Sequence, residues 1–314
     1  MRPLPADEIR GNWATLLLPI QADEGIDHGC LADEIDYLVA AGVDGIYSNG
    51  TAGEFYTQTE DEFDRISTLL AERCERGGIP FQIGASHMSP QLSLSRIRRA
   101  VKLKPSAIQV ILSDWKTLND DEVVDCLQRF AAAAQPVGLV LYNPPHAKRV
   151  LEPPIYARLR QAVPELVGIK VADGDDDWYA QMRQHAAGLS IFVPGHHLIH
   201  GLPKGAHGAY SNVACLQPIG AQKLVELAQT DYERALGIET RLQAFMTQHI
   251  APYIQQQGYA NQAVDKLLAG VGNWAEVGTR LRWPYRWIDS ADAERLRPIA
   301  RAAVPELFTC ENGY

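Results

Sequence analysis

The stretch Val167-Gly168-Ile169-Lys170-Val171-Ala172-Asp173 places a lysine in the middle of an apolar, β-branched run. Apolar residues on both sides of the lysine are typical of a parallel strand that is buried on both faces. An ammonium group is costly in such a place unless it is paired or loses its proton. Lys170 is therefore either a strand-end lysine that reaches solvent or a carboxylate such as Asp173, or an amine with a pKa lowered by burial that forms a Schiff base.

The chain on both sides of Lys170 repeats one unit, an apolar segment followed by a helical pattern. Short apolar segments predict strands, and apolar positions spaced three and four residues apart predict helices. The predicted strands cover residues 13–20, 43–48, 80–85, 106–112, 137–142, 166–171, 189–193 and 208–211. The predicted helices cover residues 27–41, 59–76, 90–103, 120–134, 153–163, 177–187 and 218–229, with a short helix near Leu198. Thr59 and Asn119 precede acidic first turns, which favours helix starts there.

This alternation predicts a (β/α)8 TIM barrel, with a doubly wound open sheet as the alternative fold. Eight strand–helix units in about 220 residues are what a barrel requires. From residue 232 onward the strand signals stop, and helical patterns follow over residues 232–256, 262–268 and 291–303. We therefore expect residues 1–230 to form the barrel and carry the active site. Residues 231–314 are expected to form a C-terminal helical extension packed on the barrel.

The composition narrows the class of protein. A net charge of −9 without a basic block argues against nucleic acid or an anionic membrane as a partner. The chain has no apolar run long enough to span a bilayer and no signal-peptide pattern at its start. Its five cysteines lie far apart and form no CxxC pair: Cys30, Cys74, Cys126, Cys215 and Cys310. We expect them to be reduced, in a cytoplasmic protein that acts on a small molecule.

Polar and reactive side chains follow the predicted strands at their C-terminal ends, where barrels place their catalytic groups. Besides Lys170, these strand ends carry Gly50-Thr51-Ala52-Gly53-Glu54, Ser86-His87, Tyr142-Asn143-Pro144-Pro145-His146, Gly195-His196-His197 and Tyr210-Ser211-Asn212. Their positions make His87, His196 and Tyr210 candidate substrate-binding residues.

Two of these strand ends have a structural and a functional interpretation. The turn from Gly50 to Glu54 suits a carboxylate or phosphate, because neither Gly50 nor Gly53 has a Cβ to obstruct the backbone N–H groups. It is not a Walker loop, since Thr51 stands where the lysine is required, and it is alternatively a tight turn in which Glu54 bonds backbone donors. Tyr142, aimed by the two prolines that follow, is either a proton shuttle for a substrate on the next strand or a tyrosine whose hydroxyl satisfies a backbone group.

His196 and His200 are four residues apart, on one face of the predicted short helix, which permits a zinc pair. His197 stands where an HExxH motif has its glutamate, and no third ligand is evident nearby. We therefore expect no metal. These histidines are expected instead to line the mouth of a pocket or to cap a helix.

Together, Gly50-Thr51-Ala52-Gly53-Glu54, Tyr142-Asn143-Pro144-Pro145 and Gly168-Ile169-Lys170 resemble the dihydrodipicolinate synthase / N-acetylneuraminate lyase family. This family consists of Schiff-base barrel lyases with a C-terminal helical extension, and the similarity covers nearly the whole chain. The resemblance implies that Lys170 forms a covalent imine with a 2-oxo acid, usually pyruvate, without a cofactor. It also implies that Tyr142 is the proton shuttle, and that the Thr51-Ala52 backbone with the Thr51 hydroxyl holds the substrate carboxylate. A homotetramer, commonly a dimer of dimers, or a dimer is expected.

The sequence departs from the synthases of this family at three places. Ala52 replaces the second threonine of their GTTGE motif, Leu112-Ser113-Asp114-Trp115 replaces their paired tyrosine, and Ala147 stands where an arginine grips the second substrate. These departures predict a divergent member rather than a true dihydrodipicolinate synthase. A different polar or anionic substrate tail is expected to meet a group of basic side chains: His87, His146, Lys148, Arg149, His196 and His197.

The sequence therefore predicts a class I, lysine-dependent lyase. Its substrate is expected to be a 2-oxo acid such as pyruvate or a 2-keto sugar acid, transformed by aldol cleavage or condensation, or by dehydration. One alternative is a barrel that still binds 2-oxo acids but turns nothing over. Another is a metal-dependent aldolase that uses His196 and His200.

Overall fold

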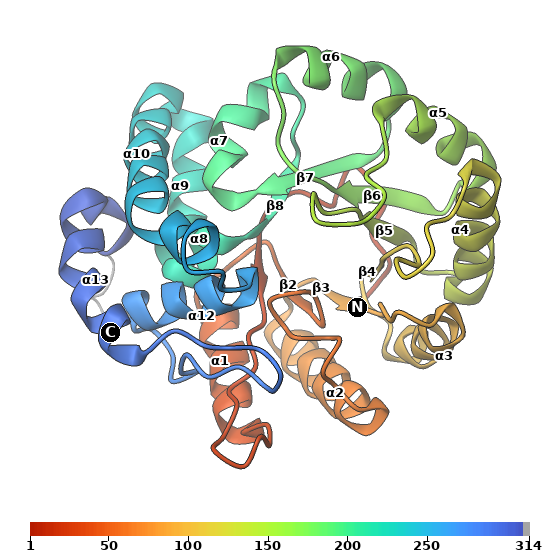
Figure 1. The fold of residues 1–314 in the computed structure, drawn as a ribbon. Coiled ribbons are helices and arrows are strands. Elements are labelled where there is room, and N and C mark those ends of the chain that lie inside the picture. Colours follow the sequence, from red (N-terminus) through yellow and green to blue (C-terminus); the bar gives the residue numbers. More distant parts are fainter. Residues whose placement is uncertain (310–314) are drawn as a thin grey trace.

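Eight short parallel strands close into a barrel in the computed structural model, which describes residues 1–309 (Figure 1). The strands are β1 (Gly11–Thr15), β2 (Gly45–Ser48), β3 (Phe81–Gly84), β4 (Ala107–Val110), β5 (Leu139–Tyr142), β6 (Leu166–Lys170), β7 (Ser190–Pro194) and β8 (Gly208–Ser211). Strand β1 pairs with β2 on one side and with β8 on the other, which leaves no sheet edge. The predicted TIM barrel is thus confirmed, and the open-sheet alternative is wrong.

Helices connect consecutive strands and cover the outside of the barrel. They are α1 (His28–Ala40), α2 (Glu60–Gly77), α3 (Pro90–Ala100), α4 (Asp120–Ala134), α5 (Pro153–Ala162), α6 (Asp176–His185) and α7 (Leu198–Gly201), followed after β8 by α8 (Asn212–Leu216) and α9 (Pro218–Thr230). Thr59 and Asn119 form capping boxes with Glu62 and Glu122, so the predicted starts of α2 and α4 are confirmed.

The structure differs from the prediction at two barrel elements. Strand β1 ends at Thr15 instead of residue 20, because the Leu17 N–H turns to the buried Glu34 carboxylate at 2.8 Å. Helix α8 was not predicted, because its five residues are too few to show a helical period. The Ser211 side chain caps it by accepting a hydrogen bond from the Ala214 N–H.

The C-terminal helices gather beside α8 and α9 on one side of the barrel (Figure 1). They are α10 (Tyr232–Phe245), a π-helical turn (Met246–Ile250), α11 (Ala251–Gln255), α12 (Asn261–Gly272) and α13 (Ser290–Ala303). The predicted single helix over residues 232–256 is interrupted, because Pro252 has no N–H to donate to the preceding turn. Helix α12 packs between α8 and α13, and this position brings it to the mouth of the barrel.

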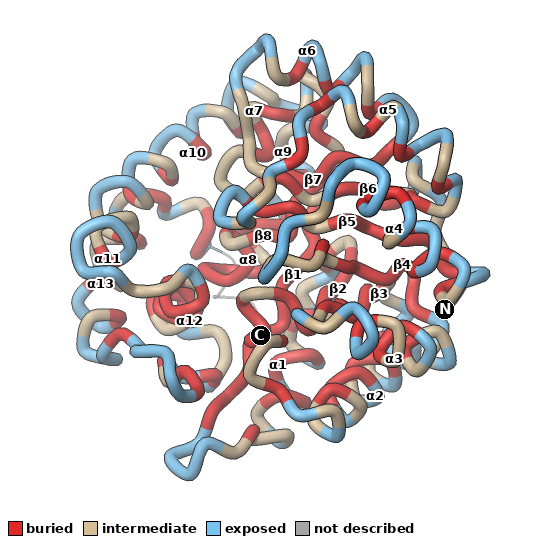
Figure 2. The backbone as a smooth tube through the Cα atoms, turned by 45° about the vertical axis from the view of Figure 1, so that its right-hand side comes forward, coloured by how far each residue is buried: buried red, intermediate tan, exposed pale blue. Residues whose placement is uncertain are grey.

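Buried residues fill two regions, one inside the barrel and one between the strands and the helices (Figure 2). Inside the barrel, Tyr47 stacks on Tyr210 with ring centroids 4.2 Å apart, and their hydroxyls donate to the buried Gln109 and Gln82. These two rings close the barrel interior and form the floor of the cavity described below.

The structure also shows the state of the cysteines and whether any helix could cross a membrane. Cys30, Cys74, Cys126 and Cys215 are free thiols, and Cys310 lies outside the described residues. Within residues 1–309, no helix combines the length and the apolar character that a membrane crossing requires.

Candidate active site

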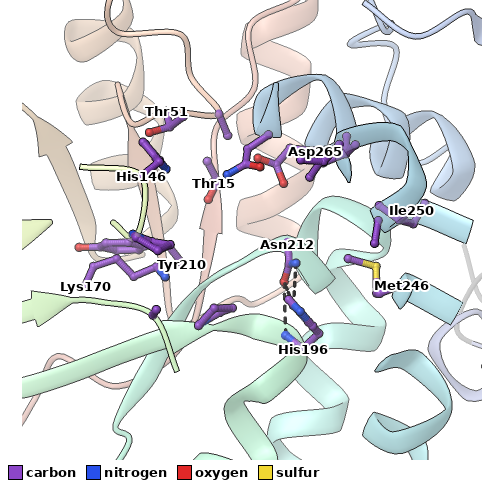
Figure 3. Close-up of a pocket in the computed structure, with 18 of the residues that line it drawn as sticks. Thr15, Thr51, His146, Lys170, His196, Tyr210, Asn212, Met246, Ile250 and Asp265 are labelled. Atoms are coloured by element: carbon purple, nitrogen blue, oxygen red, sulfur yellow. Dashed lines mark hydrogen bonds between the residues drawn. The ribbon is translucent and has the colours of Figure 1, made fainter. Parts of the chain in front are cut away.

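A cavity of about 350 Å³ opens at the C-terminal ends of the strands (Figure 3). Its wall brings together six of the eight predicted site residues: Lys170, Tyr142, Thr51, Ala52, Tyr210 and His196. The C-terminal helices contribute the opposite wall, with Met246, Ile250 and Asp265 among the lining residues. Residues of the barrel and of the C-terminal helices therefore line the cavity together.

Lys170 is the last residue of β6 and lies in register with Tyr142, the last residue of β5. Its Nζ donates a hydrogen bond to the Val171 carbonyl at 3.0 Å and lies 6.0 Å from the centre of the Tyr142 ring. Burial lowers the pKa of Lys170 to about 8, although the charges of Asp265 and Asp173 oppose the shift. A useful fraction of this amine is therefore neutral and nucleophilic close to neutral pH.

Asp173, the carboxylate expected as a possible partner of Lys170, is engaged elsewhere. It lies 3.1 Å from His197 Nδ1, and it accepts a hydrogen bond from the Tyr179 hydroxyl at 2.6 Å. Lys170 thus has a backbone carbonyl as its hydrogen-bond acceptor and keeps its amine on the cavity side.

Tyr142 presents a protonated phenol to the cavity. Burial raises the pKa of Tyr142 to about 12, and a hydrogen bond with the Thr51 side chain opposes the shift. The turn that follows is fixed by Asn143, which donates to the Arg149 carbonyl at 2.9 Å and accepts from the Leu151 N–H at 2.7 Å. The phenol therefore sits on a rigid turn and can pass a proton between a ligand and Thr51.

The turn after β2 is shaped for close contact with an anion. A Cβ on Gly50 would lie 2.1 Å from the Tyr47 hydroxyl, so only glycine fits there, although Gly50 itself does not line the cavity. Within residues 1–309, the N–H groups of Thr51 and Ala52 donate to no protein acceptor. They are free to receive a carboxylate, with the Thr51 hydroxyl beside them.

Glu54, in the same turn, faces away from the cavity. Its carboxylate pairs with Lys266 of α12 at 2.8 Å, and both side chains are fully buried. It also accepts a hydrogen bond from the Arg282 N–H at 3.0 Å. The glutamate of the turn therefore anchors the C-terminal helices to β2, and it does not bond the N–H groups of its own turn.

The two histidines of the metal alternative do not converge on one point. His196 bonds Asn212 through its Nδ1, and burial lowers the pKa of His196 to about 4, so its ring is neutral (Figure 3). His200 Nε2 lies 2.8 Å from Lys204 Nζ. Among residues 1–309, no group of three or more histidine, cysteine or acidic side chains is arranged to hold a metal ion.

The six basic residues expected to receive a substrate tail are not brought together. Only His146 and His196 line the Lys170 cavity. His87 does not line this cavity, and its Nδ1 accepts a hydrogen bond from the Ser89 N–H at 2.9 Å. The other three are held by protein groups, since His197 pairs with Asp173, Lys148 packs on the ring of Trp115, and Arg149 bonds the Leu118 carbonyl and Asp120.

Tyr210 reaches the cavity only with its ring. Its hydroxyl donates to Gln82 inside the barrel and is therefore not free for a substrate. Its expected binding role is thus limited to a contact between a ligand and the face of the ring.

Asp265 was not identified from the sequence, although it lines the cavity opposite Lys170 (Figure 3). Burial raises the pKa of Asp265 to about 7, and the charge of Lys170 opposes the shift. The only sequence signal is a charged pair, Asp265-Lys266, inside the apolar run from Ala263 to Ala269. Such a pair in a helix that is otherwise apolar is costly unless both charges have a purpose.

Comparisons with known proteins found relatives of this chain. The 4-hydroxy-tetrahydrodipicolinate synthase of Acidobacterium capsulatum is 30% identical over 166 residues, which are 52% of this chain and 54% of that protein. The chain therefore spans about half the length of this relative. The enzyme of the same name from Thermomicrobium roseum is 26% identical over 223 residues, 70% of this chain and 72% of the relative.

Among solved structures, YagE, a prophage protein from E. coli K12 crystallised with pyruvate, superposes with a TM-score of 0.82. The superposition covers 94% of this chain and 98% of YagE at 20% identity, so it shows a common fold. The Dihydrodipicolinate synthetase family model matches residues 8–302, nearly the whole chain. With its barrel and C-terminal helices, the chain is therefore a member of the dihydrodipicolinate synthetase family of lyases.

Proposed function

We propose that the protein is a class I lyase whose Lys170 forms a Schiff base with a 2-oxo acid such as pyruvate or a 2-keto sugar acid. The observation that carries the proposal is a lysine of lowered pKa at the end of β6, open to a cavity and beside Tyr142. The pyruvate in the YagE crystal supports this class of substrate. No cofactor is required, because the imine itself is the electron sink.

The proposed reaction begins at the Lys170 amine. The neutral Lys170 amine adds to the C2 carbonyl of the 2-oxo acid, and loss of water gives an iminium ion. Electrons of the C3–C4 bond then move toward the iminium while a C4 hydroxyl loses its proton, which releases an aldehyde and leaves an enamine. The enamine takes a proton at C3, and hydrolysis frees pyruvate and the amine. In a dehydration, C3 loses a proton instead and the neighbouring hydroxyl leaves as water.

In this proposal, the turn after β2 binds the substrate carboxylate and Tyr142 transfers protons. The Thr51 and Ala52 N–H groups hold the C1 carboxylate, which orients C2 toward Lys170. Tyr142, bonded to the Thr51 side chain, transfers the protons that leave and enter the substrate. The family resemblance also leads us to propose a homotetramer or dimer, which sedimentation analysis of the full chain will test.

Trapping with borohydride tests the proposal directly. Incubation with pyruvate and borohydride should reduce the imine to a stable adduct, which mass spectrometry of peptides should place on Lys170. The Lys170→Ala variant should give no adduct and no turnover. The absence of an adduct, or an adduct on another lysine, would refute the proposal, and loss of turnover in a chelator would instead support the metal-dependent alternative.

A further inference from the structure

The cavity has a reactive side and a distal side. Lys170 and Thr51 lie on one side, and the C-terminal helices that carry Met246, Ile250 and Asp265 close the other (Figure 3). Tyr142 belongs to the first side, because it lies in register with Lys170. We expect a 2-oxo acid bound through C1 and C2 on the reactive side to extend its distal carbons toward Met246, Ile250 and Asp265, which line the same cavity. The groups on this distal side therefore decide which substrate tails are accepted.

Asp265 is held toward the distal side by the helix that carries it. Asn261, Val264 and Asp265 share one face of α12, three and four residues apart, and all three line the cavity. The next residue, Lys266, points the other way and is fixed by its buried ion pair with Glu54. This pair prevents α12 from turning, so the Asp265 carboxylate is a built part of the wall.

The distal side of the cavity carries a negative charge, the Asp265 carboxylate, without a positive charge beside it within residues 1–309. Among the described lining residues, Asp265 is the single carboxylate and Lys170 the single lysine, with no arginine. The lining histidines are His146 and His196, and burial lowers the pKa of each, which keeps both rings neutral. On the distal side, the described lining residues therefore offer no cation to receive a phosphate or a second carboxylate beside Asp265.

Among residues 1–309, Asp265 has no protein partner that would neutralise it. Its carboxyl group makes no hydrogen bond or ion pair with another described residue. Burial raises the pKa of Asp265, and the charge of Lys170 opposes this shift. Its oxygens are free to accept hydrogen bonds from ligand hydroxyls, which are stronger when the acceptor is charged. The Thr15 hydroxyl, also in the wall, offers a further polar contact.

On the basis of the proposed imine chemistry, we propose that Asp265 selects substrates by charge. The site takes 2-oxo acids whose distal end is uncharged and carries hydroxyl groups, and it rejects phosphorylated and dicarboxylic ones. The basic residues of the sequence suggested a polar or anionic tail. The proposed specificity keeps the polar tail and excludes the anionic one, because only two of those six residues line the cavity.

Two acids of equal chain length measure this selection without requiring turnover. 2-Oxohexanoate ends in a methyl group and 2-oxoadipate in a carboxylate, and borohydride trapping reports how readily each forms an imine. At about pH 8.5, where a carboxyl group with a pKa near 7 is ionised, we expect trapping of 2-oxohexanoate to exceed that of 2-oxoadipate by about 100-fold. The Asp265→Asn variant should reduce this ratio to less than about tenfold.

Controls separate this inference from the function on which it rests. Asp177→Asn removes the same charge from the exposed start of α6 and should leave the ratio unchanged. If Asp265→Asn does not fold, Asp265→Ser takes its place. The wild type alone already shows whether 2-oxohexanoate is trapped more readily than 2-oxoadipate. Equal trapping of the two acids by the wild type, or a ratio unaffected by either Asp265 substitution, would overturn charge selection while leaving a pyruvate adduct on Lys170 intact. If pyruvate gives no adduct, both proposals fall.

Discussion

Helix α12 contributes to two lysine–acid pairs, Lys266 with Glu54 and Asp265 with Lys170. The first pair stabilises the fold, and the second lies in the candidate active site. Lys266 and Glu54 are fully buried and in direct contact at 2.8 Å, and Lys266 also donates to the Arg280 carbonyl at 2.5 Å. Lys170 and Asp265 face one another across an open cavity and make no such contact. The first pair joins the C-terminal helices to the barrel, and the second leaves an amine and a carboxyl group free for a ligand.

Burial alone does not make a lysine reactive, as Lys266 and Lys170 show. Burial lowers the pKa of both amines, while Glu54 opposes the shift at Lys266. At Lys266 the charged partner and the absence of free space prevent any reaction with a ligand. At Lys170 the amine is accessible from the cavity, so a lowered pKa makes it available to a carbonyl carbon.

The largest expected effect is the loss of chemistry in Lys170→Met. This substitution should reduce turnover by about 10⁴-fold or more, because no other group replaces the nucleophile. The free energy of unfolding should change by less than about 1 kcal/mol, because the ammonium gains only one backbone hydrogen bond. Steady-state assays and urea titrations of the same preparation measure both quantities. Substantial residual turnover would assign the nucleophile to another residue.

Tyr142→Phe should also lower turnover at the Lys170 site, by less than Lys170→Met does. Removal of the phenol should slow turnover by roughly 10²- to 10⁴-fold, because protons then have no positioned group to carry them. Imine formation should persist, so borohydride should still trap pyruvate on Lys170. Stopped-flow and trapping measurements on one enzyme preparation separate the two steps. A variant with the wild-type rate would show that the hydroxyl has only a structural part.

Lys266→Met tests the other member of the pair. It leaves the Glu54 charge buried without a counter-charge, which should cost about 3–5 kcal/mol of unfolding free energy. Thermal and urea unfolding measure the loss, and Lys170→Met is the matched control because the same side chain is exchanged. The double variant Lys266→Met with Glu54→Gln should recover part of the stability. If Lys266→Met were as stable as the wild type, the proposed anchoring of α12 would be wrong.

The barrel and the reactive side of the site were predictable from the sequence because their signals are local. Lys170 and Tyr142 end, and Thr51 follows, a strand that an apolar run marks, and the barrel brings such strand ends together. Asp265 was missed because its place depends on how α12 packs against α8, a contact between segments far apart in the chain. His87 was included for its strand end alone, and no local pattern indicates that its ring turns to Ser89.

The smallest expected effect is a shift in the pH dependence of imine formation. Only the neutral amine attacks, so the rate of pyruvate trapping should rise with pH, with a midpoint at about 8. The negative charge of Asp265 raises the pKa of Lys170, which means that its removal in Asp265→Asn should move the midpoint to lower pH. Trapping at pH 7 should then be about two- to tenfold faster. Asp177→Asn should leave the midpoint in place, and a shift to higher pH in Asp265→Asn would show that the two groups do not interact across the cavity as their charges require.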